Sequence, residues 1–143
     1  MNQAPVKVSI IIPHHKGEAL LYKCLQSLNN TSYSNYEIIV VDNNSKDQSI
    51  LKSKKEFPEI KVVSLEQNHG YAGGCNKGAL EAQGELLLFL NNDTIVNENA
   101  IEKLLIYFHQ NPSTTRRLLP TLNPTKHSIQ LSKLSTIISS TTS

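Results

Sequence analysis

The chain has 143 residues, of which 38% are hydrophobic, and this is enough for one domain with a buried core. Its net charge of +2 gives no reason to expect nucleic acid as a partner. The polar N-terminus and the lack of a long apolar run argue against a signal peptide and a transmembrane segment. We therefore expect a cytoplasmic protein, either free or peripheral at the inner face of a membrane.

Four short apolar segments have the composition of buried β-strands. They are rich in Ile, Val and Leu, and turn-forming or polar residues bound each of them. We expect Pro13 to end the first strand, because proline cannot donate a hydrogen bond to a sheet. The predicted strands are residues 6–12, 37–42, 60–65 and 86–90.

Apolar residues recur at helical spacing between and after these strands. A first helix is predicted over 18–29. A capping box of Ser45 and Gln48 predicts a second helix running towards Phe57. Gly84 predicts the end of a third helix, and a fourth is expected from about residue 97 to Pro112. The residues expected to face the core are Leu21, Cys24, Leu25 and Leu28 in the first helix, Ala72, Cys75, Ala79 and Leu80 in the third, and Ile101, Leu104, Leu105 and Phe108 in the fourth.

The order of these elements, a strand and then a helix four times over, is typical of α/β folds. The strands are nearly continuous apolar runs, which is the pattern of a parallel sheet with helices on both faces. Cys24 and Cys75 fall on apolar helix faces without metal or redox spacing, so we expect buried free thiols. The sequence thus predicts a Rossmann-like parallel sheet within residues 1–112.

Residues 113–143 differ from the rest of the chain in composition. Fourteen of these 31 residues are Ser or Thr, and the segment carries four basic residues and no acid, whereas residues 1–112 carry 10 Lys against 12 acids. Segments of this kind bury too little apolar surface to offset the entropy lost on ordering. We expect an irregular tail with no strand of convincing length. The alternative is a reading frame that departs from its ancestral course near residue 112.

Polar side chains follow each of the four predicted strands. The carboxyl ends of parallel strands meet at one edge of a sheet, where α/β proteins bind ligands. A single polar cluster is an ordinary turn, but four at one edge favour a binding site. The clusters are Pro13-His14-His15, Asp42-Asn43-Asn44-Ser45, Gln67-Asn68-His69-Gly70 and Asn91-Asn92-Asp93.

The third cluster continues into a glycine-rich segment, "NHGYAGGCNKG", residues 68–78. Free backbone N–H groups at the start of the following helix could bind phosphate. The segment matches neither G-x-G-x-x-G nor a P-loop, so dinucleotide binding stays open but unsupported. The alternative is close packing of helix on sheet through Gly74 and Gly78.

Two side-chain types in these clusters bear on metal binding. His14 and His15 are adjacent, so in extended chain they point to opposite sides and do not easily bind one metal together. Asp93 is a better candidate. A diphosphate bound through Mg²⁺ or Mn²⁺ needs only one or two carboxylates besides phosphate oxygens and water.

Taken together, "VSIIIPHHKG", "EIIVVDNNSKD", "NHGYAGGCNKG" and "LLLFLNNDTIV" resemble the nucleotide-sugar half of family 2 glycosyltransferases, which have the GT-A fold. The resemblance covers residues 6–111. The pairing of NxGYAGGxN with LNND is similar to the subgroup often labelled rhamnosyltransferase-like. The resemblance implies a truncated GT-A domain, with the nucleotide-sugar-binding half in residues 1–112 and a tail in 113–143.

The resemblance also assigns functions to residues. It implies that the base and ribose of a nucleoside diphosphate sugar contact Pro13, His15, Asp42 and Asn43. The glycine loop frames the donor through Asn68, Gly70, Gly74 and Asn76. A D-x-D element holds Mg²⁺ or Mn²⁺, here through Asp93 and Asn91. This chain keeps only the last acid of that element, and Asn43 stands where many members have a second Asp.

The implied reaction is an inverting transfer to a hydroxyl of a saccharide or lipid-linked acceptor, as in polysaccharide biosynthesis. A metal neutralises the leaving diphosphate and a carboxylate base deprotonates the acceptor. No acid follows Glu102, so the base is unassigned and we expect donor binding without sugar transfer. The alternative is a non-catalytic nucleotide-binding or interaction module. A sugar-nucleotide pyrophosphorylase is disfavoured, because Lys16 and Gly17 alone supply its glycine-rich, basic segment.

Overall fold

The computed structural model describes residues 5–111, 116–117 and 127–130. The strands of the first range are β1 (Val8–His14), β2 (Tyr36–Asp42), β3 (Lys61–Ser64) and β4 (Leu86–Phe89). The helices are α1 (Glu18–Asn29), α2 (Ser49–Glu56), α3 (Gly70–Glu81) and α4 (Ala100–Gln110). Two short strands follow, β5 (Arg116–Arg117) and β6 (His127–Gln130). The predicted alternation of strands and helices is confirmed.

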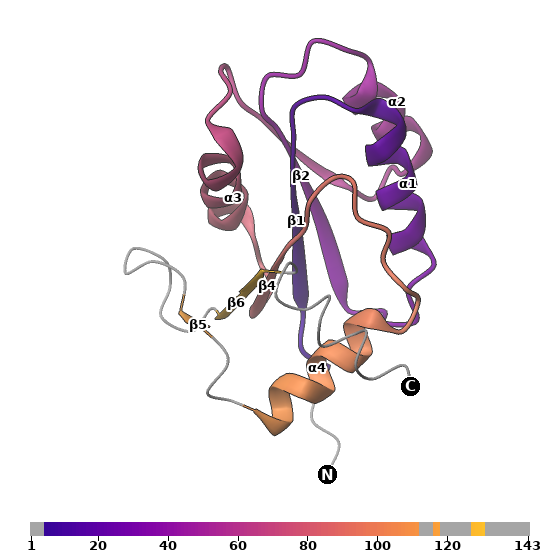
Figure 1. Cartoon of the computed structure of the whole chain (residues 1–143), viewed down its shortest axis with the longest axis vertical. Helices are drawn as coiled ribbons and strands as arrows, with labels where there is room; N and C mark the ends of the chain where they lie inside the picture. The colour runs from indigo at the N-terminus through magenta and orange to yellow at the C-terminus, as the bar shows by residue number, and fades with distance from the viewer. Residues whose placement is uncertain (1–4, 112–115, 118–126, 131–143) are drawn as a thin grey trace.

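The described strands form one sheet in the order β3-β2-β1-β4-β6-β5. β1 lies between β2 and β4 and is parallel to both, while β5 is antiparallel to β6. The chain moves outward from β1 to β3 and then returns to the other side of β1 as β4 (Figure 1). This reversal between β1 and β4 is the topological switch point, outside which open α/β sheets bind ligands.

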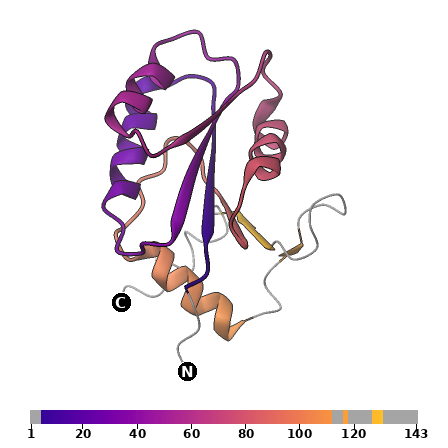
Figure 2. The same ribbon diagram turned by 180° about the vertical axis from the view of Figure 1, so that it is seen from behind.

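Helices cover both faces of the sheet, as predicted. Successive residues of a strand point to opposite faces. Ile10 and Ile12 of β1 therefore share one core cluster with Leu21 and Leu25 of α1, whereas Ile11 belongs to a second cluster beneath α3. Two views from opposite sides show α1 and α2 on one side of the sheet and α3 on the other (Figures 1 and 2).

Pro13 lies inside β1 and does not end it, so that prediction is wrong. The carbonyl of Ile11 accepts the N–H of Leu90 on the β4 side, and the carbonyl of His14 accepts the N–H of Asn43 on the β2 side. Because alternate residues face alternate neighbours, Pro13 faces the β4 side. There it lies beyond the last paired residue of β4, where no ladder bond requires an N–H.

Helix α2 begins later than predicted. The N–H of Ser45 donates to Asp42 Oδ1 at 2.8 Å, so Ser45 belongs to the loop that leaves β2. The helix starts at Ser49 after Gln48, and the N–H of Ser49 donates to Asp47 Oδ1 at 3.0 Å. The capping-box prediction is therefore wrong, because Ser45 lies three residues before the N-cap Gln48, and Asp47 accepts the N–H of the first helical residue.

Helix α3 buries Cys75 and Ala79, as predicted, but its buried face is rotated from the predicted one. Ala72 and Leu80 are exposed, against expectation. A Cβ at Gly78 would lie 2.5 Å from Ile11 and 2.8 Å from Val41, so the helix approaches the sheet too closely for a side chain there. The residues that α3 buries are Gly74, Cys75, Gly78 and Ala79.

Helix α4 begins at Ala100, close to the predicted start. Ile101 and Leu104 are buried, and Leu105 and Phe108 pack partly buried against the same core, as predicted. The two cysteines are free and buried, which was also predicted. Within the described part of the chain, every helix is too short or too polar to cross a bilayer.

Strand β6 lies in the segment that was expected to lack a convincing strand. It pairs in parallel with β4, from Leu86 opposite His127 to Phe89 opposite Gln130. The free edge of β4 presents unpaired N–H and C=O groups, which an extended segment can satisfy. Most of the predicted tail lies outside the described residues, and its boundary at residue 112 stays a prediction.

Candidate functional site at the carboxyl edge of the sheet

A chain of polar side chains joins β1 to β4 at the switch point. His14 ends β1 and is 1% exposed. The Nδ2 atom of Asn92, which follows β4, lies 3.0 Å from His14 Nδ1 and 3.0 Å from the carbonyl oxygen of Lys16. His14 Nε2 lies 2.7 Å from Ser49 Oγ at the start of α2, and Ser49 Oγ donates a short hydrogen bond to Asp47. We call these four side chains, of His14, Asn92, Ser49 and Asp47, the His14 relay.

The chemistry of the groups places each proton in the His14 relay. The carbonyl of Lys16 can only accept, so the Asn92 atom beside it is the NH₂ nitrogen, and His14 Nδ1 must accept from the same NH₂ group. Burial lowers the pKa of His14, against an opposing effect of Asp47, so the ring is neutral at pH 7. Its single proton is therefore on Nε2 and is donated to Ser49 Oγ, whose own hydrogen goes to Asp47.

The relay was not predicted from the sequence. His14 and His15 were expected to point to opposite sides, and the structure confirms this, with His14 buried and His15 exposed. Ser49 and Asp47 were given no function, because their spacing matches no motif. The available signal was the histidine that ends a central strand, because a buried imidazole needs partners for both nitrogens.

Asn43 holds the glycine loop against β2. Its side chain is 3% exposed. Its Oδ1 accepts the N–H of His69 at 3.1 Å, and its Nδ2 donates to the carbonyl of Gly70 at 3.0 Å. The backbone carbonyl of Asn43 lies 2.9 Å from His15 Nδ1. Both amide atoms are thus engaged by the loop, and an aspartate here would place a second acceptor against the Gly70 carbonyl.

Three more of the predicted residues shape the same loop. Asn68 is exposed, and its Oδ1 accepts the N–H of Gly70 at 2.8 Å. Gly70 has φ +74°, a left-handed conformation that suits glycine. A Cβ at Gly74 would lie 2.8 Å from Asn43 Nδ2 and 3.1 Å from Pro13 Cβ, so a side chain at Gly74 would disturb both.

The remaining residues that were predicted to bind the nucleotide sugar lie at different distances from the strand ends. Asp42 ends β2 half-buried, and its Oδ1 accepts the N–H of Ser45. His15 lies beside it, exposed, one residue after β1. Asn76 is exposed on the second turn of α3, farther from the strand ends than the rest. Asp42 and His15 are therefore brought together, and Asn76 is the outlying member.

Asn91 and Asp93 are exposed beyond the end of β4, on either side of the inward Asn92. Cys24 lies below them, with its Sγ 3.9 Å from the carbonyl of Asn91. Burial, and then the charge of Asp93, raises the pKa of Cys24 to about 12, so this thiol stays protonated.

Asn91 and Asp93 can be compared with the ligands that the metal implied by the resemblance requires. Over residues 5–111 and the two described strands beyond, no three His, Cys, Asp or Glu side chains gather as a metal site. One carboxylate and one amide oxygen do fit Mg²⁺ or Mn²⁺ when a diphosphate and water supply the other ligands. The residues present are therefore adequate for a metal that arrives with its nucleotide.

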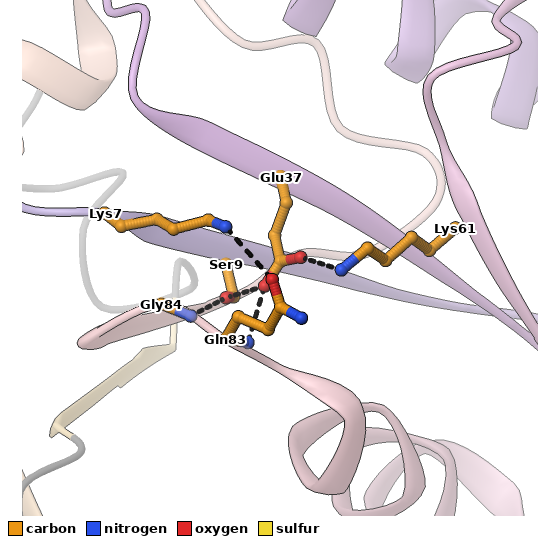
Figure 3. A network of polar contacts seen from close by, with 6 residues as sticks. All are labelled: Lys7, Ser9, Glu37, Lys61, Gln83 and Gly84. Carbon is orange, nitrogen blue, oxygen red and sulfur yellow. Dashed lines mark hydrogen bonds and ion pairs between the residues drawn. The ribbon is translucent and has the colours of Figure 1, made fainter.

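The amino edge of the sheet has a polar network of a different kind (Figure 3). Glu37 accepts hydrogen bonds from Lys61 Nζ, Ser9 Oγ and the N–H of Gln83, each at 2.6 Å. Burial acts to raise the pKa of Glu37, but these hydrogen bonds outweigh it and lower the pKa to about 2. The N–H of Gly84 donates to Ser9 Oγ at 2.8 Å, so Gly84 serves this network and does not end α3 as predicted.

A cavity of about 500 Å³ lies beside Glu37 and Lys61 at the amino edge, and another of about 530 Å³ lies between α1 and α2, beside Tyr22 and Lys52, with Ser49 in its lining. Glu37 and Lys61 at the first cavity are already paired with each other. We place the candidate site at the carboxyl edge, because polar side chains from three strands converge there and His15, Asn91 and Asp93 among them are exposed.

Comparison with known proteins shows which family the chain belongs to. Residues 9–117 match the family model for glycosyl transferase family 2. An uncharacterised glycosyltransferase of Haemophilus influenzae is 36% identical over 106 residues, which cover 74% of this chain and 36% of that protein. The GalNAc(5)-diNAcBac-PP-undecaprenol beta-1,3-glucosyltransferase of Campylobacter jejuni is 35% identical over 104 residues, which cover 69% of this chain and 33% of that protein.

A solved structure shares the fold. Staphylococcus aureus TarS, residues 1–349 in complex with UDP-GlcNAc, superposes with a TM-score of 0.67 at 28% identity, covering 74% of this chain and 32% of that one. The chain thus spans about a third of the length of each of these three proteins. The GT-A fold that the resemblance implied is confirmed, whereas the rhamnosyltransferase-like subgroup stays a prediction. Because the family model matches most of its length, the chain belongs to glycosyl transferase family 2.

Proposed function

We propose that the carboxyl edge of this sheet binds a nucleoside diphosphate sugar, and that the protein transfers the sugar to an acceptor hydroxyl with inversion. The observation that carries the proposal is the convergence of the ends of β1, β2 and β4 at the switch point. Asn92 lies 3.0 Å from His14, and His15 lies 2.9 Å from the carbonyl of Asn43. Open α/β sheets bind ligands at this position.

The names of the similar proteins support the classes of donor and acceptor. TarS was solved with UDP-GlcNAc, and the Campylobacter jejuni protein is named for a saccharide linked to undecaprenol diphosphate. We propose a nucleoside diphosphate sugar as donor, and a saccharide or lipid-linked saccharide as acceptor. The rhamnosyltransferase-like subgroup is tested by offering nucleoside diphosphate rhamnose beside the corresponding glucose donor.

Within this proposal, His15 and Asp42 contact the base and ribose, because both lie at the adjacent ends of β1 and β2. Asn43 and Gly70 hold the loop that frames the donor. Asp93 and its neighbour Asn91 would hold Mg²⁺ or Mn²⁺, and the cation supplies neutralisation of the charge on the leaving diphosphate. Asn76 is too far along α3 for a direct contact with the base, so we assign it to the periphery of the donor.

Inversion follows from the direction of attack. The acceptor oxygen forms its bond to the anomeric carbon on one face of the sugar, while the bond to the diphosphate oxygen breaks on the other. The hydroxyl proton goes to a carboxylate base. No residue of the described part is assigned to that task, and no acid follows Glu102 in the chain.

The second candidate function is a nucleotide-binding module without transfer. The missing first acid of the D-x-D element favours it, since Asn91 stands in that place. The two functions differ in one measurement, which is a transfer assay with a panel of nucleoside diphosphate sugars beside the binding assay below. Turnover by this chain would exclude the second candidate, whereas binding without turnover would support it.

The binding assay is calorimetry with uridine, thymidine and guanosine diphosphates, each with Mn²⁺. We expect at least one to bind, and Asp42→Asn to weaken it. Glu59→Gln is the matched control, because Glu59 is an exposed acid outside the site. If all three nucleotides failed to bind to a folded sample, the proposed site would be wrong.

A further inference from the structure

The middle residue of Asn91-Asn92-Asp93 is turned inward, while its two neighbours are exposed. The amide hydrogens of Asn92 are both engaged, one by His14 Nδ1 and one by the Lys16 carbonyl. We propose that Asn92 and His14 are positioning residues, which hold Asp93 and Asn91 towards the diphosphate of the donor. This inference rests on the proposed function.

The triplet needs such a restraint, because the sheet does not supply one. β4 ends at Phe89, and the last backbone bond from this segment to β1 is the N–H of Leu90 to the carbonyl of Ile11. Beyond it, the N–H of Thr94 donates to the carbonyl of Asn91 within the turn itself. The side chain of Asn92 therefore ties the turn to His14 at the end of β1 and to Lys16, beside the contact of Cys24 Sγ with the Asn91 carbonyl, and this restrains the residues on either side of it.

His14 is suited to this task because its ring cannot turn freely. It is 1% exposed and hydrogen-bonded at both nitrogens. Its Nε2–H is donated to Ser49, which is itself 1% exposed and donates to Asp47. The relay thus anchors the end of β4 to the start of α2 through a ring of fixed tautomer. Groups that hydrogen-bond to metal ligands and so orient them commonly have a large effect on metal affinity when they are mutated.

The serine, histidine and aspartate of the relay are not a hydrolytic triad. In such a triad the serine hydroxyl donates to the histidine and faces a substrate, while the carboxylate bonds to the far nitrogen of the ring. Here Ser49 is buried, its hydrogen goes to Asp47, and the far nitrogen of His14 faces Asn92. The arrangement orients a neighbouring segment and offers no nucleophile.

Asn92→Leu tests the inference. Leucine has a similar volume but cannot donate, so the Lys16 carbonyl and His14 Nδ1 lose their partner and the triplet is released. The contacts of the base and ribose with His15 and Asp42 remain. We expect the gain in nucleotide affinity that Mn²⁺ confers to fall about tenfold, while affinity without Mn²⁺ is unchanged.

A second pair of variants tests the far end of the relay. Ser49→Ala removes the partner of His14 Nε2 and the hydroxyl that donates to Asp47, and we expect the Mn²⁺-dependent gain to fall about threefold, because of these two bonds only the neutral one holds the His14 ring. Ser53→Ala is the matched control. It deletes another buried hydroxyl of the same helix, 3% exposed, which has no part in the relay. We expect it to leave the gain unchanged.

The measurement is calorimetry of each variant with uridine, thymidine and guanosine diphosphates, with and without Mn²⁺, on samples whose folding is checked by thermal unfolding. A gain that is reduced in Asn92→Leu and Ser49→Ala but intact in Ser53→Ala supports the inference. An unchanged gain in Asn92→Leu overturns it, and so does an equal loss of affinity with and without Mn²⁺, which would indicate a purely structural role. If wild type binds nucleotide but shows no gain with Mn²⁺, this inference fails alone; if wild type binds no nucleotide, the proposed function fails with it.

Discussion

The two edges of the sheet are both polar, but they use polar groups differently. At the amino edge, Glu37 is surrounded by donors from Lys61, Ser9 and Gln83, and the network satisfies itself (Figure 3). At the carboxyl edge, the His14 relay is also satisfied, yet it leaves Asp93 exposed beside it. The carboxylate of the amino edge is paired within the fold, whereas the carboxyl edge keeps an exposed carboxylate, and this difference underlies our proposal of a ligand site there.

The space around the glycines also differs between the two edges. Substitution of these glycines gives the largest expected effect on stability. A Cβ at Gly84 would lie 2.6 Å from Ser9 Oγ, 2.7 Å from Ser9 N and 2.8 Å from the carbonyl oxygen of Lys7, and backbone atoms cannot give way as a side chain can. We expect Gly84→Ala to lower the free energy of unfolding by about 3 kcal/mol, measured by urea denaturation. At the carboxyl edge, Gly70 has open space, so Gly70→Ala should cost only about 1 kcal/mol through its positive φ. Equal costs at the two positions would show that the edges do not differ in this way.

Asp93→Asn tests whether the exposed carboxylate serves a ligand. Loss of residues that merely orient a metal ligand costs tenfold or more, so loss of the ligand itself should cost between about tenfold and a hundredfold in Mn²⁺-dependent nucleotide affinity. Fold stability should hardly change, because Asp93 is exposed. Calorimetry with and without Mn²⁺ gives the affinity, and Glu98→Gln, at another exposed acid in the same loop, is the control. A destabilised Asp93→Asn with unchanged affinity would reverse the assignment.

Glu37→Gln tests the opposite expectation at the amino edge. The pKa of Glu37 is lowered from 4.5 to about 2, so its stabilisation is fully present above about pH 4.5 and is lost as the pH falls towards 2. We expect the variant to be less stable by about 1–2 kcal/mol at pH 7, and to lose part of the wild-type fall in stability between pH 4.5 and 2. Urea denaturation at several pH values measures both. Nucleotide affinity should stay at its wild-type level, and a large loss of affinity would place the binding site at the wrong edge.

The smallest expected effect concerns two ion pairs. Lys61 binds Glu37, whose side chain is 8% exposed, whereas Lys52 binds Glu18 with side chains 60% and 39% exposed. We expect Lys61→Met to cost about 1 kcal/mol and Lys52→Met less than about 0.5 kcal/mol. Thermal unfolding of the two variants under one set of conditions gives the comparison. A larger cost at Lys52 would contradict the view that burial at the amino edge gives its ion pair the greater weight.

The fold, and the gathering of polar side chains at the carboxyl edge, could be predicted from sequence, because both depend on local signals. Buried strands are continuous apolar runs, and the order of strands and helices then brings their carboxyl ends to one edge. The errors arose where a distant partner decides the local structure. Pro13 continues β1 because β4 ends early beside it, and α2 begins at Ser49, whose N–H is accepted by Asp47, and not at the expected serine cap.

The relay itself was beyond sequence reasoning for a related reason. His14 meets Ser49 across 35 residues and Asn92 across 78, and neither partner carries a spacing that marks it. In the sequence, Asn92 is only the middle residue of a D-x-D-like triplet, in which the two outer residues are the expected metal ligands. The inward direction of the Asn92 side chain depends on the end of β1, which lies beside Asn92 only in the folded sheet.

The most direct test of the central claim is to locate Mn²⁺ on the folded chain by nuclear magnetic resonance. Mn²⁺ broadens the amide signals of nearby residues, so a titration in the presence of the nucleoside diphosphate that binds best maps the site without assuming it. We predict broadening centred on Asn91 to Asp93, reaching His15 and Asp42, with Glu37 and Lys61 unaffected. Broadening centred on the amino edge, or none beyond that of Mn²⁺ without nucleotide, would contradict the assignment of the carboxyl edge as the donor site.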